Sequence, residues 1–311
     1  MKAVEVLGLS KRYGSKPALE AVSFDVESGD AVALVGRNGA GKTTLLRILA
    51  TLLKPTAGYA RILEMDGRFQ ASKIRRALGY MPDAVPMEED LTVEEYLEFY
   101  AGLQGLRADA RAGAVKGLVE LLELGEVREK TCGSLSRGMQ QRVGLARTLV
   151  HNPSVLLLDE PAANLDPRAR IEIREVLKTL RKLGKTILVS SHILMELGEF
   201  CNKIAVIDQG KLLHFGPISE VAARLRPRRR LLLRVTGDAA GYAAKLRGEP
   251  GVEEVAEADG WLKVLLREGV EDYAFVARHA AGDGVSLRAL HEEEAGLEEI
   301  FMRLTGGKGG A

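Results

Sequence analysis

The sequence predicts an α/β fold built on a parallel sheet, followed by a small α+β domain at the carboxyl end of the chain. Two unbroken apolar runs of strand length, Val155–Leu158 and Thr186–Ser190, are separated by a helical stretch at Arg168–Leu183. Continuous hydrophobicity indicates strands that are covered on both faces, which is typical of a parallel sheet with crossover helices. A strand–loop–helix unit near the amino end of the chain supports the same architecture.

Length and composition fit a globular protein with one large domain and one small one. The 311 residues exceed what a single hydrophobic core usually organises. The chain is 46% hydrophobic and 28% charged, which separates it from disordered and fibrous classes. Its 44 basic and 43 acidic residues leave a formal charge of +1, so no overall field attracts nucleic acid. We therefore expect no nucleic-acid partner.

Cysteine usage and hydropathy predict a cytosolic protein. Cys132 and Cys201 are too few and too isolated for a disulfide framework or a zinc site, which fits a reducing compartment. Residues Met1–Ser10 lack the apolar core of a signal peptide. The apolar runs are far shorter than the roughly 20 residues that a membrane-spanning helix needs, so we expect no membrane crossing.

The first half of the chain predicts strands followed by a helical segment. From Val4 to Glu64, short apolar runs alternate with turn residues, which predicts strands around the strand–loop–helix unit. Between Leu91 and Leu124 the apolar spacing changes to three and four, which predicts helices. The residues that show this spacing first are Val93, Tyr96, Leu97 and Tyr100.

A domain boundary is predicted at Arg224–Arg230, where five arginines and Pro227 fall within seven residues. The boundary divides the chain into residues 1–223, a linker at 224–230 and a small domain at 231–311. We interpret the arginine run as a solvated linker, and the alternative is a contact with an anionic lipid or protein.

Beyond the linker, strands and helices alternate in the split βαβ order of ferredoxin-like domains. The predicted elements are, in order, strand Leu231–Val235, helix Ala239–Leu246, strands Val252–Ala256 and Trp261–Leu266, helix Val270–His279, strand Val285–Ala289 and helix Glu293–Leu304. None of the chemical motifs below falls in this region, so we expect a regulatory or dimer-stabilising role for it.

A phosphate-binding loop lies between the apolar run Ala31–Val35 and the helical run Thr44–Leu53, the strand–loop–helix context that this motif requires. Its residues are Gly36, Arg37, Asn38, Gly39, Ala40, Gly41, Lys42 and Thr43, and Thr44 completes the set expected to contact the nucleotide. The glycines let the backbone wrap around phosphate closely. Lys42 should reach the β- and γ-phosphates, and the Thr43 hydroxyl should ligate Mg²⁺. The motif does not choose among P-loop families.

A second motif adds two carboxylates. The apolar run from Val155 ends in Asp159 and Glu160, followed by Pro161. Because side chains alternate along a strand and diverge at its end, these carboxylates can serve different roles. We expect Asp159 to orient Mg²⁺ and Glu160 to polarise water, which predicts hydrolysis.

A third segment, Leu135–Arg142, resembles the signature motif of the ABC ATPase family through the order Leu-Ser-Arg-Gly-Met-Gln-Gln-Arg. Further landmarks occur in the family's order: Tyr13 at the adenine-stacking position, Ala163–Asp166 as the D-loop, and Ser191 with His192 as the switch histidine. The resemblance covers residues 1 to about 217. The tail is similar to the small carboxy-terminal domain of ATPase subunits in bacterial drug- and antibiotic-export systems.

The resemblance implies a P-loop ABC ATPase core with a parallel sheet, an antiparallel β subdomain and a helical subdomain. It also implies a head-to-tail dimer, homodimeric or heterodimeric, that encloses two ATP molecules. In this arrangement Ser136 and Gly138 of one subunit close over ATP held by Lys42 of the other. Glu160 and His192 act on the γ-phosphate and the attacking water, with ATP and Mg²⁺ as cofactors. Asp166 would link the two sites.

The resemblance further implies a transmembrane permease partner and a peripheral location on the cytoplasmic face of the cell membrane. The signature and the carboxy-terminal domain look like those of exporters, whose cargo is chosen by the membrane subunit. The alternative is a soluble ABC ATPase that acts on nucleic acid or ribosomes. Lys42 and Asp159 are only 117 positions apart, with no sustained heptads and one P-loop, which favours transport over that alternative.

Two departures from the family's pattern involve charged residues. Arg137 and Met139 replace the commoner glycine and glutamine of the signature, although Ser136 and Gly138 are retained. Asp83 stands where the family usually has the glutamine of its Q-loop. Asp83 is therefore expected either to contact the magnesium or water, or to serve as a structural turn residue.

Overall fold

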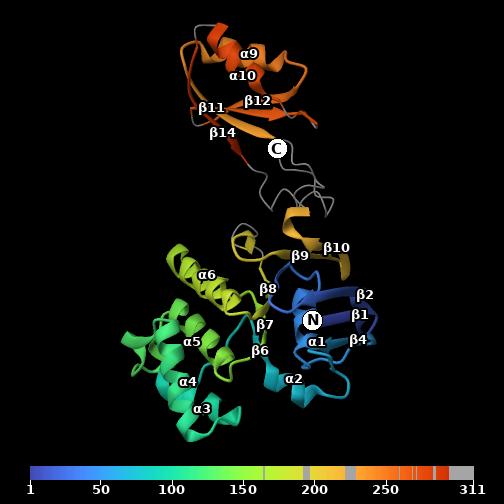
Figure 1. Cartoon of the computed structure of the whole chain (residues 1–311), viewed down its shortest axis with the longest axis vertical. Coiled ribbons are helices and arrows are strands. Elements are labelled where there is room, and N and C mark those ends of the chain that lie inside the picture. Colours follow the sequence, from blue (N-terminus) through green and yellow to red (C-terminus); the bar gives the residue numbers. More distant parts are fainter. Residues whose placement is uncertain are drawn as a thin grey trace. The chain divides into compact units, whose positions relative to one another are not determined.

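The computed structural model describes residues 1–163, 165–191, 197–220, 229–258, 260–267, 269–270, 272–282 and 285–293. The chain divides into two compact units, Met1–Ile218 and Ser219–Ala311 (Figure 1). The predicted linker at 224–230 lies largely outside the described residues, so its boundaries stay a prediction. No helix in the described part of the chain is long and apolar enough to span a bilayer.

A six-stranded sheet forms the centre of the first unit, in the order β10-β9-β3-β8-β7-β6. Five neighbouring strands run parallel, and only the edge strand β10 is antiparallel. The strands are β3 (Ala31–Val35), β6 (Leu78–Met81), β7 (Val155–Asp159), β8 (Thr186–Ser190), β9 (Lys203–Asp208) and β10 (Lys211–Pro217). Every residue of β3, β7 and β8 is buried, which confirms the prediction of strands covered on both faces.

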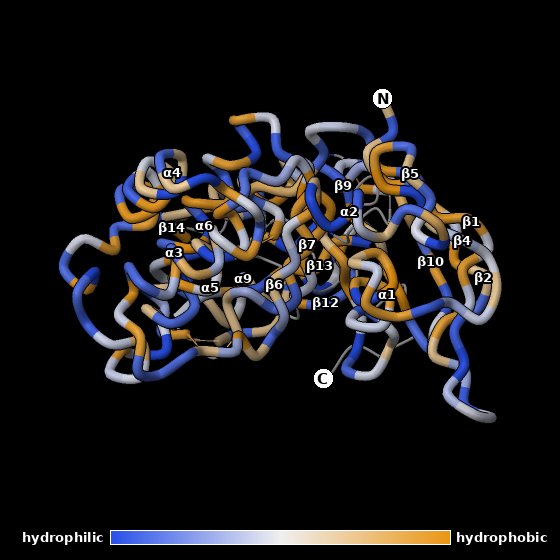
Figure 2. Tube along the Cα trace, turned by 90° about the horizontal axis from the view of Figure 1, so that it is seen from below, coloured by the Kyte–Doolittle hydropathy of each residue, from blue (hydrophilic) through white to orange (hydrophobic). Residues whose placement is uncertain are grey.

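A helix, α1 (Lys42–Leu49), follows the phosphate loop and contacts strands of both sheets in this unit. Its buried side chains Leu45, Leu46 and Leu49 belong to the large hydrophobic core, and hydrophobic and hydrophilic colours alternate along α1 in Figure 2. The predicted helix at 44–53 begins two residues earlier and ends sooner. It ends because Thr51 has a φ of 60°, in the left-handed region.

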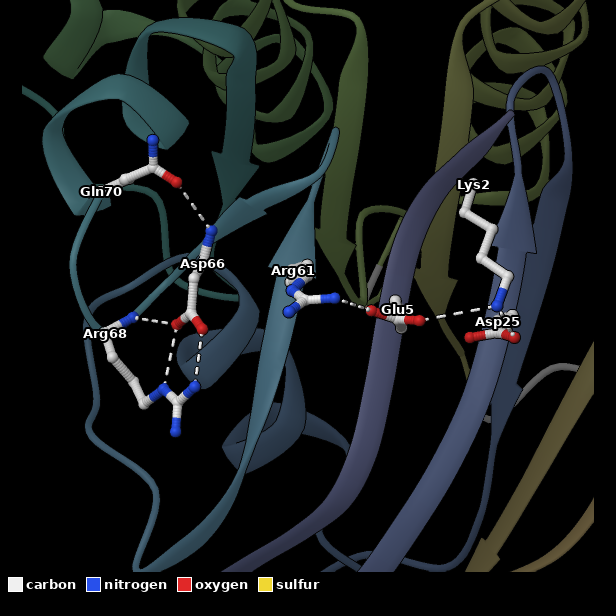
Figure 3. Close-up of polar contacts among 7 residues, drawn as sticks. All are labelled: Lys2, Glu5, Asp25, Arg61, Asp66, Arg68 and Gln70. Carbon is white, nitrogen blue, oxygen red and sulfur yellow. Dashed lines mark hydrogen bonds and ion pairs between the residues drawn. The ribbon is translucent and has the colours of Figure 1, made fainter.

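An antiparallel sheet, in the order β2-β1-β4-β5, packs beside the central one. Its strands are β1 (Lys2–Tyr13), β2 (Lys16–Glu27), β4 (Ala57–Ile62) and β5 (Met65–Asp66). Glu5 lies directly opposite Asp25 on β2 and Arg61 on β4. Lys2 contacts both carboxylates, at 3.5 and 2.7 Å, and Arg61 lies 3.1 Å from Glu5 (Figure 3). These cations offset the repulsion between two like charges in register.

Much of the remaining described part of the first unit is helical. Its α-helices with described bounds are α2 (Ala71–Ala77), α3 (Val93–Leu103), α4 (Ala108–Leu121), α5 (Arg137–Leu149) and α6 (Pro167–Lys182), and two 3-10 helices span Gly125–Val127 and Cys132–Ser134. The predicted helical segment at 91–124 is two helices, because Gly105 turns the chain with a φ of 82°. Arg142 of α5 is buried and hydrogen-bonds to Glu172 of α6 and to the carbonyl of Leu122 after α4. One guanidinium thus connects three helical segments.

The second unit has the predicted ferredoxin-like order. Its elements are β11 (Arg230–Thr236), α9 (Ala239–Arg247), β12 (Val252–Ala258), β13 (Trp261–Leu266), α10 (Ala274–Gly282) and β14 (Ser286–Glu293). The strands form one antiparallel sheet in the order β12-β13-β11-β14, with both helices on one face (Figure 1). α10 begins at Ala274 rather than Val270, since Asp272 accepts the Ala274 N–H. The predicted helix at 293–304 lies outside the described residues beyond Glu293.

The amino end of α3 provides a stability test. Thr92 accepts the Glu95 N–H at 3.2 Å, and the Glu95 carboxylate accepts the Thr92 N–H at 2.9 Å. Thr92→Ala removes this capping box and should lower the free energy of unfolding by about 1 kcal/mol. Urea unfolding of the intact chain measures the change, with Thr92→Ser as the matched control that keeps the hydroxyl. Equal midpoints for Thr92→Ala and wild type would contradict the assignment.

Candidate nucleotide site

The loop between β3 and α1 has a backbone that only glycine accommodates at several positions. A Cβ on Gly36 would lie 2.3 Å from the carbonyl oxygen of Ile207, and one on Gly41 would lie 2.5 Å from that of Ala18. Gly39 and Gly41 also have φ values of 79° and 113°. The loop therefore keeps its shape through close backbone contacts, and it ends at the amino terminus of α1, where N–H groups favour anions.

Lys42, the first residue of α1, is 7% exposed and folds back over its own loop. Its Nζ donates to the carbonyl oxygen of Gly36 at 2.7 Å and lies 3.9 Å from Oε1 of Glu160. Burial lowers the pKa of Lys42, and the nearby charges of Glu160 and Asp159 oppose that shift. The ammonium is thus held by oxygen atoms that phosphate oxygens can replace.

The two carboxylates diverge at the end of β7, as predicted. Asp159 is 1% exposed, and its Oδ1 accepts the Ser190 hydroxyl at 2.7 Å. Glu160 has a φ of 50°, which turns the chain so that its carboxylate faces Lys42. The structure therefore brings Lys42, Asp159 and Glu160 to one edge of the parallel sheet. Thr43 and Thr44 lie half-buried in the adjoining first turn of α1.

Asp83 lies on the same edge, in an exposed bend two residues beyond β6. Its backbone carbonyl accepts a hydrogen bond from Nε2 of Gln141 on α5, at 3.4 Å. Asp83 also lines a hollow of about 240 Å³ together with Arg137 and Leu165. The bend that contains Asp83 therefore contacts the signature helix directly.

The signature residues lie apart from the phosphate loop. Ser136 caps α5 by accepting the Met139 N–H at 3.4 Å. Ser136, Gly138 and Asp166 line a hollow of about 600 Å³, and the residues described around it include none of the P-loop. Asp166 also caps α6, since its Oδ1 accepts the Ala169 N–H at 3.0 Å. Within one chain, the signature and the phosphate loop thus form two separate surfaces.

Of two other predicted site residues, Tyr13 is described by the structure and His192 is not. Tyr13 ends β1 on the antiparallel sheet, is 50% exposed, and has the Lys11 ammonium 5.3 Å from its ring centroid. His192 lies outside the described residues, and its role stays a prediction. Ser190 is a neighbour of the site that sequence reasoning missed. Its signal was a hydroxyl at the carboxyl end of a strand whose preceding three residues are apolar.

A glycine-rich loop between a parallel strand and a helix, with two carboxylates at the end of a nearby strand, defines a P-loop nucleotide-binding domain. The family model described as ABC transporter matches residues 19–163. The chain is 35% identical over 310 residues to the probable multidrug ABC transporter ATP-binding protein YbhF of Escherichia coli strain K12. That match covers 97% of this chain and 52% of YbhF, so the chain spans about half the length of that relative.

Other relatives are covered along most of their length. The chain is 31% identical to the daunorubicin resistance ATP-binding protein DrrA3 of Streptomyces coeruleorubidus, and the match covers 98% of this chain and 96% of DrrA3. A solved dimeric ATP-binding cassette in a post-hydrolysis state, bound to ADP and Pi, is 27% identical with a TM-score of 0.64. The match covers 69% of this chain and 98% of the solved chain. This chain belongs to the family of ABC transporter ATP-binding proteins.

The lysine of the loop provides the first test of the site. Lys42→Ala should abolish tight binding of Mg-ATP, because it removes the buried cation placed over the phosphate loop. Titration with a fluorescent ATP analogue measures the affinity, and the melting temperature shows whether the variant is folded. Lys116→Ala, an exposed lysine on α4, is the matched control. Unchanged affinity in a folded Lys42→Ala protein would refute the phosphate assignment.

Proposed function

We propose that this chain is the ATP-hydrolysing subunit of an exporter and powers a separate transmembrane permease. The observation that carries the proposal is the convergence of Lys42, Asp159 and Glu160 at one edge of the parallel sheet, next to the phosphate loop. A cation for phosphate, a buried carboxylate for a metal and a second carboxylate for water are the groups that phosphoryl transfer to water requires.

Each residue of the site has a separate role in the proposed hydrolysis. The loop N–H groups from Gly36 to Gly41 and the Lys42 ammonium bind and orient the phosphates. Glu160 orients the attacking water and accepts its proton. Tyr13, with its half-exposed ring, stacks on the adenine, and His192 contacts the γ-phosphate.

The donor set fits Mg²⁺. The Thr43 hydroxyl and the Asp159 carboxylate are hard oxygen donors at adjoining ends of α1 and β7, and Mg²⁺ is usually held by one or two carboxylates together with phosphates. The ion, when bound, neutralises charge on the phosphates. Asp83 is the third candidate for this site, or instead the group that connects it to the partner.

Two chains are proposed to enclose two nucleotides. The signature hollow with Ser136 and Gly138 includes no described P-loop residue, so a second copy or a related chain would supply the signature to each loop. The dimeric cassette found among similar structures supports this arrangement. Either a homodimer or a heterodimer can place the signature of one chain over the phosphate loop of the other.

The relatives' names support export. One is a probable multidrug ABC transporter ATP-binding protein, another a daunorubicin resistance ATP-binding protein, and a third a Nod factor export ATP-binding protein of Burkholderia thailandensis. We infer that the chain docks on a permease at the cytoplasmic face of the membrane and that the permease selects the cargo. Co-purification from native membranes, with identification of the bound polypeptides, tests this. A ribosome or nucleic acid in place of a permease would refute it.

Hydrolysis is tested at the carboxylate beside Lys42. Glu160→Gln should still bind ATP but hydrolyse it at least about 100-fold more slowly, because the amide cannot accept a proton. The variant should accumulate as an ATP-bound dimer on size-exclusion chromatography. Glu120→Gln, on the exposed side of α4, is the matched control. Normal phosphate release by Glu160→Gln would rule out this carboxylate.

A substitution of Asp83 tests whether this residue couples ATP hydrolysis to the permease. The Asp83 side chain is exposed in a bend next to α5, and the hydrogen bond from Gln141 to its backbone carbonyl survives the substitution. We therefore expect Asp83→Ala to bind ATP nearly normally and to lose the stimulation of hydrolysis by the permease. Asp90→Ala, exposed in the same loop, is the control. If Mg-ATP affinity falls while stimulation persists, Asp83 is a metal-site group. If only the melting temperature falls, it is a turn residue.

A further inference from the structure

Ser190 is fully buried at the carboxyl end of β8, between the strand that leads to the phosphate loop and the strand that ends in the two carboxylates. In the sheet it lies opposite Leu34 of β3 and Asp159 of β7. Ser190 therefore lies between the strand before the phosphate loop and the strand before the carboxylate pair, although it belongs to neither motif.

The hydrogen bonds of the Ser190 hydroxyl have only one consistent assignment. The backbone N–H of Glu160 lies 2.9 Å from Oγ and can only donate, so Oγ accepts there. The single hydroxyl proton is then donated to Oδ1 of Asp159, at 2.7 Å. Asp159 must therefore be an acceptor at Oδ1. This leaves the second carboxylate oxygen, Oδ2, for other partners.

The same side chain supports the conformation of Glu160. A φ of 50° is in the left-handed region, which a residue with a Cβ adopts at some cost in free energy. The Glu160 N–H is held by Oγ of Ser190 and by its carbonyl oxygen, at 2.9 and 3.2 Å. These two acceptors on one residue offset the cost of the turn that directs the Glu160 carboxylate toward Lys42.

We propose that Ser190 is a positioning residue for magnesium-dependent hydrolysis: it orients the Asp159 carboxylate for the metal and fixes the backbone turn at Glu160. The inference rests on the function proposed for this site. Residues that hydrogen-bond to a metal-ligating carboxylate commonly change metal affinity or activity by about 10- to 100-fold when they are replaced. Ser190 acts through its two neighbours and does not itself contact the nucleotide.

The test compares Ser190→Ala and Ser190→Thr in the full-length protein. We measure binding of a fluorescent ATP analogue at a series of Mg²⁺ concentrations, and separately the steady-state hydrolysis of ATP. Ser190→Ala should raise the Mg²⁺ concentration needed for half-maximal binding by about 10-fold and lower kcat, while affinity without Mg²⁺ stays the same. Ser190→Thr keeps the hydroxyl and should restore most of both properties.

Thr186→Val is the matched control on the same strand. Thr186 is also buried, and its hydroxyl accepts the Gly29 N–H at 3.0 Å at the opposite end of β8. This variant should lower the melting temperature without changing the Mg²⁺ requirement. If Ser190→Ala behaves as Thr186→Val does, Ser190 is only structural and the proposal is wrong.

A second comparison covers the case in which Ser190→Thr packs poorly. In an Asp159→Asn background, Ser190→Ala should add no further change in the Mg²⁺ requirement, because the oriented carboxylate is already absent. An additive change would overturn the proposal. The binding measurement also keeps two failures distinct: a wild-type protein that binds Mg-ATP without hydrolysing it contradicts the proposed function, whereas the Mg²⁺ series still tests Ser190.

Discussion

The parallel pairing of β3, β8 and β7 is the constraint on which the site depends. Because the three strands run in the same direction and in register, their carboxyl ends lie at one edge of the sheet. Lys42, which follows β3, therefore lies at the same edge as Asp159 at the end of β7 and Ser190 at the end of β8, both more than a hundred positions away in the sequence. An antiparallel arrangement would send at least one of them to the opposite edge.

The charges at this edge of the sheet explain why it would bind phosphate. Lys42 is buried, and its lowered pKa shows that burial is only partly offset by Glu160 and Asp159. A buried ammonium with incomplete compensation favours additional negative charge, which phosphate groups supply. The carboxylates repel the phosphates, so a second cation between the two groups stabilises the bound nucleotide. The same arrangement supports the proposed use of Mg²⁺ as that cation.

Hydrogen bonds connect the helices of the first unit to one another and to a bend at this edge of the sheet. Arg142 connects α5 with α6 and with the end of α4, so these segments are expected to move together. Gln141, one residue earlier on α5, contacts the bend that contains Asp83. This hydrogen bond links α5 to the carboxyl end of β6, the strand next to the one that ends in Asp159.

The sequence by itself determined the class of fold, the phosphate loop, the carboxylate pair and the order of elements in the carboxy-terminal unit. These follow from local physics: glycine spacing, unbroken apolar runs and helical periodicity are all properties of short segments. The family came from the resemblance of Leu135–Arg142 and the motifs around it. Only the tertiary structure decided which distant groups meet. The buried Arg142 and the Ser190 hydroxyl between Asp159 and Glu160 had weak local signals or none. Each depends on a partner from another element, because hydrogen bonds across a sheet or between helices are set by register and packing rather than by neighbouring residues.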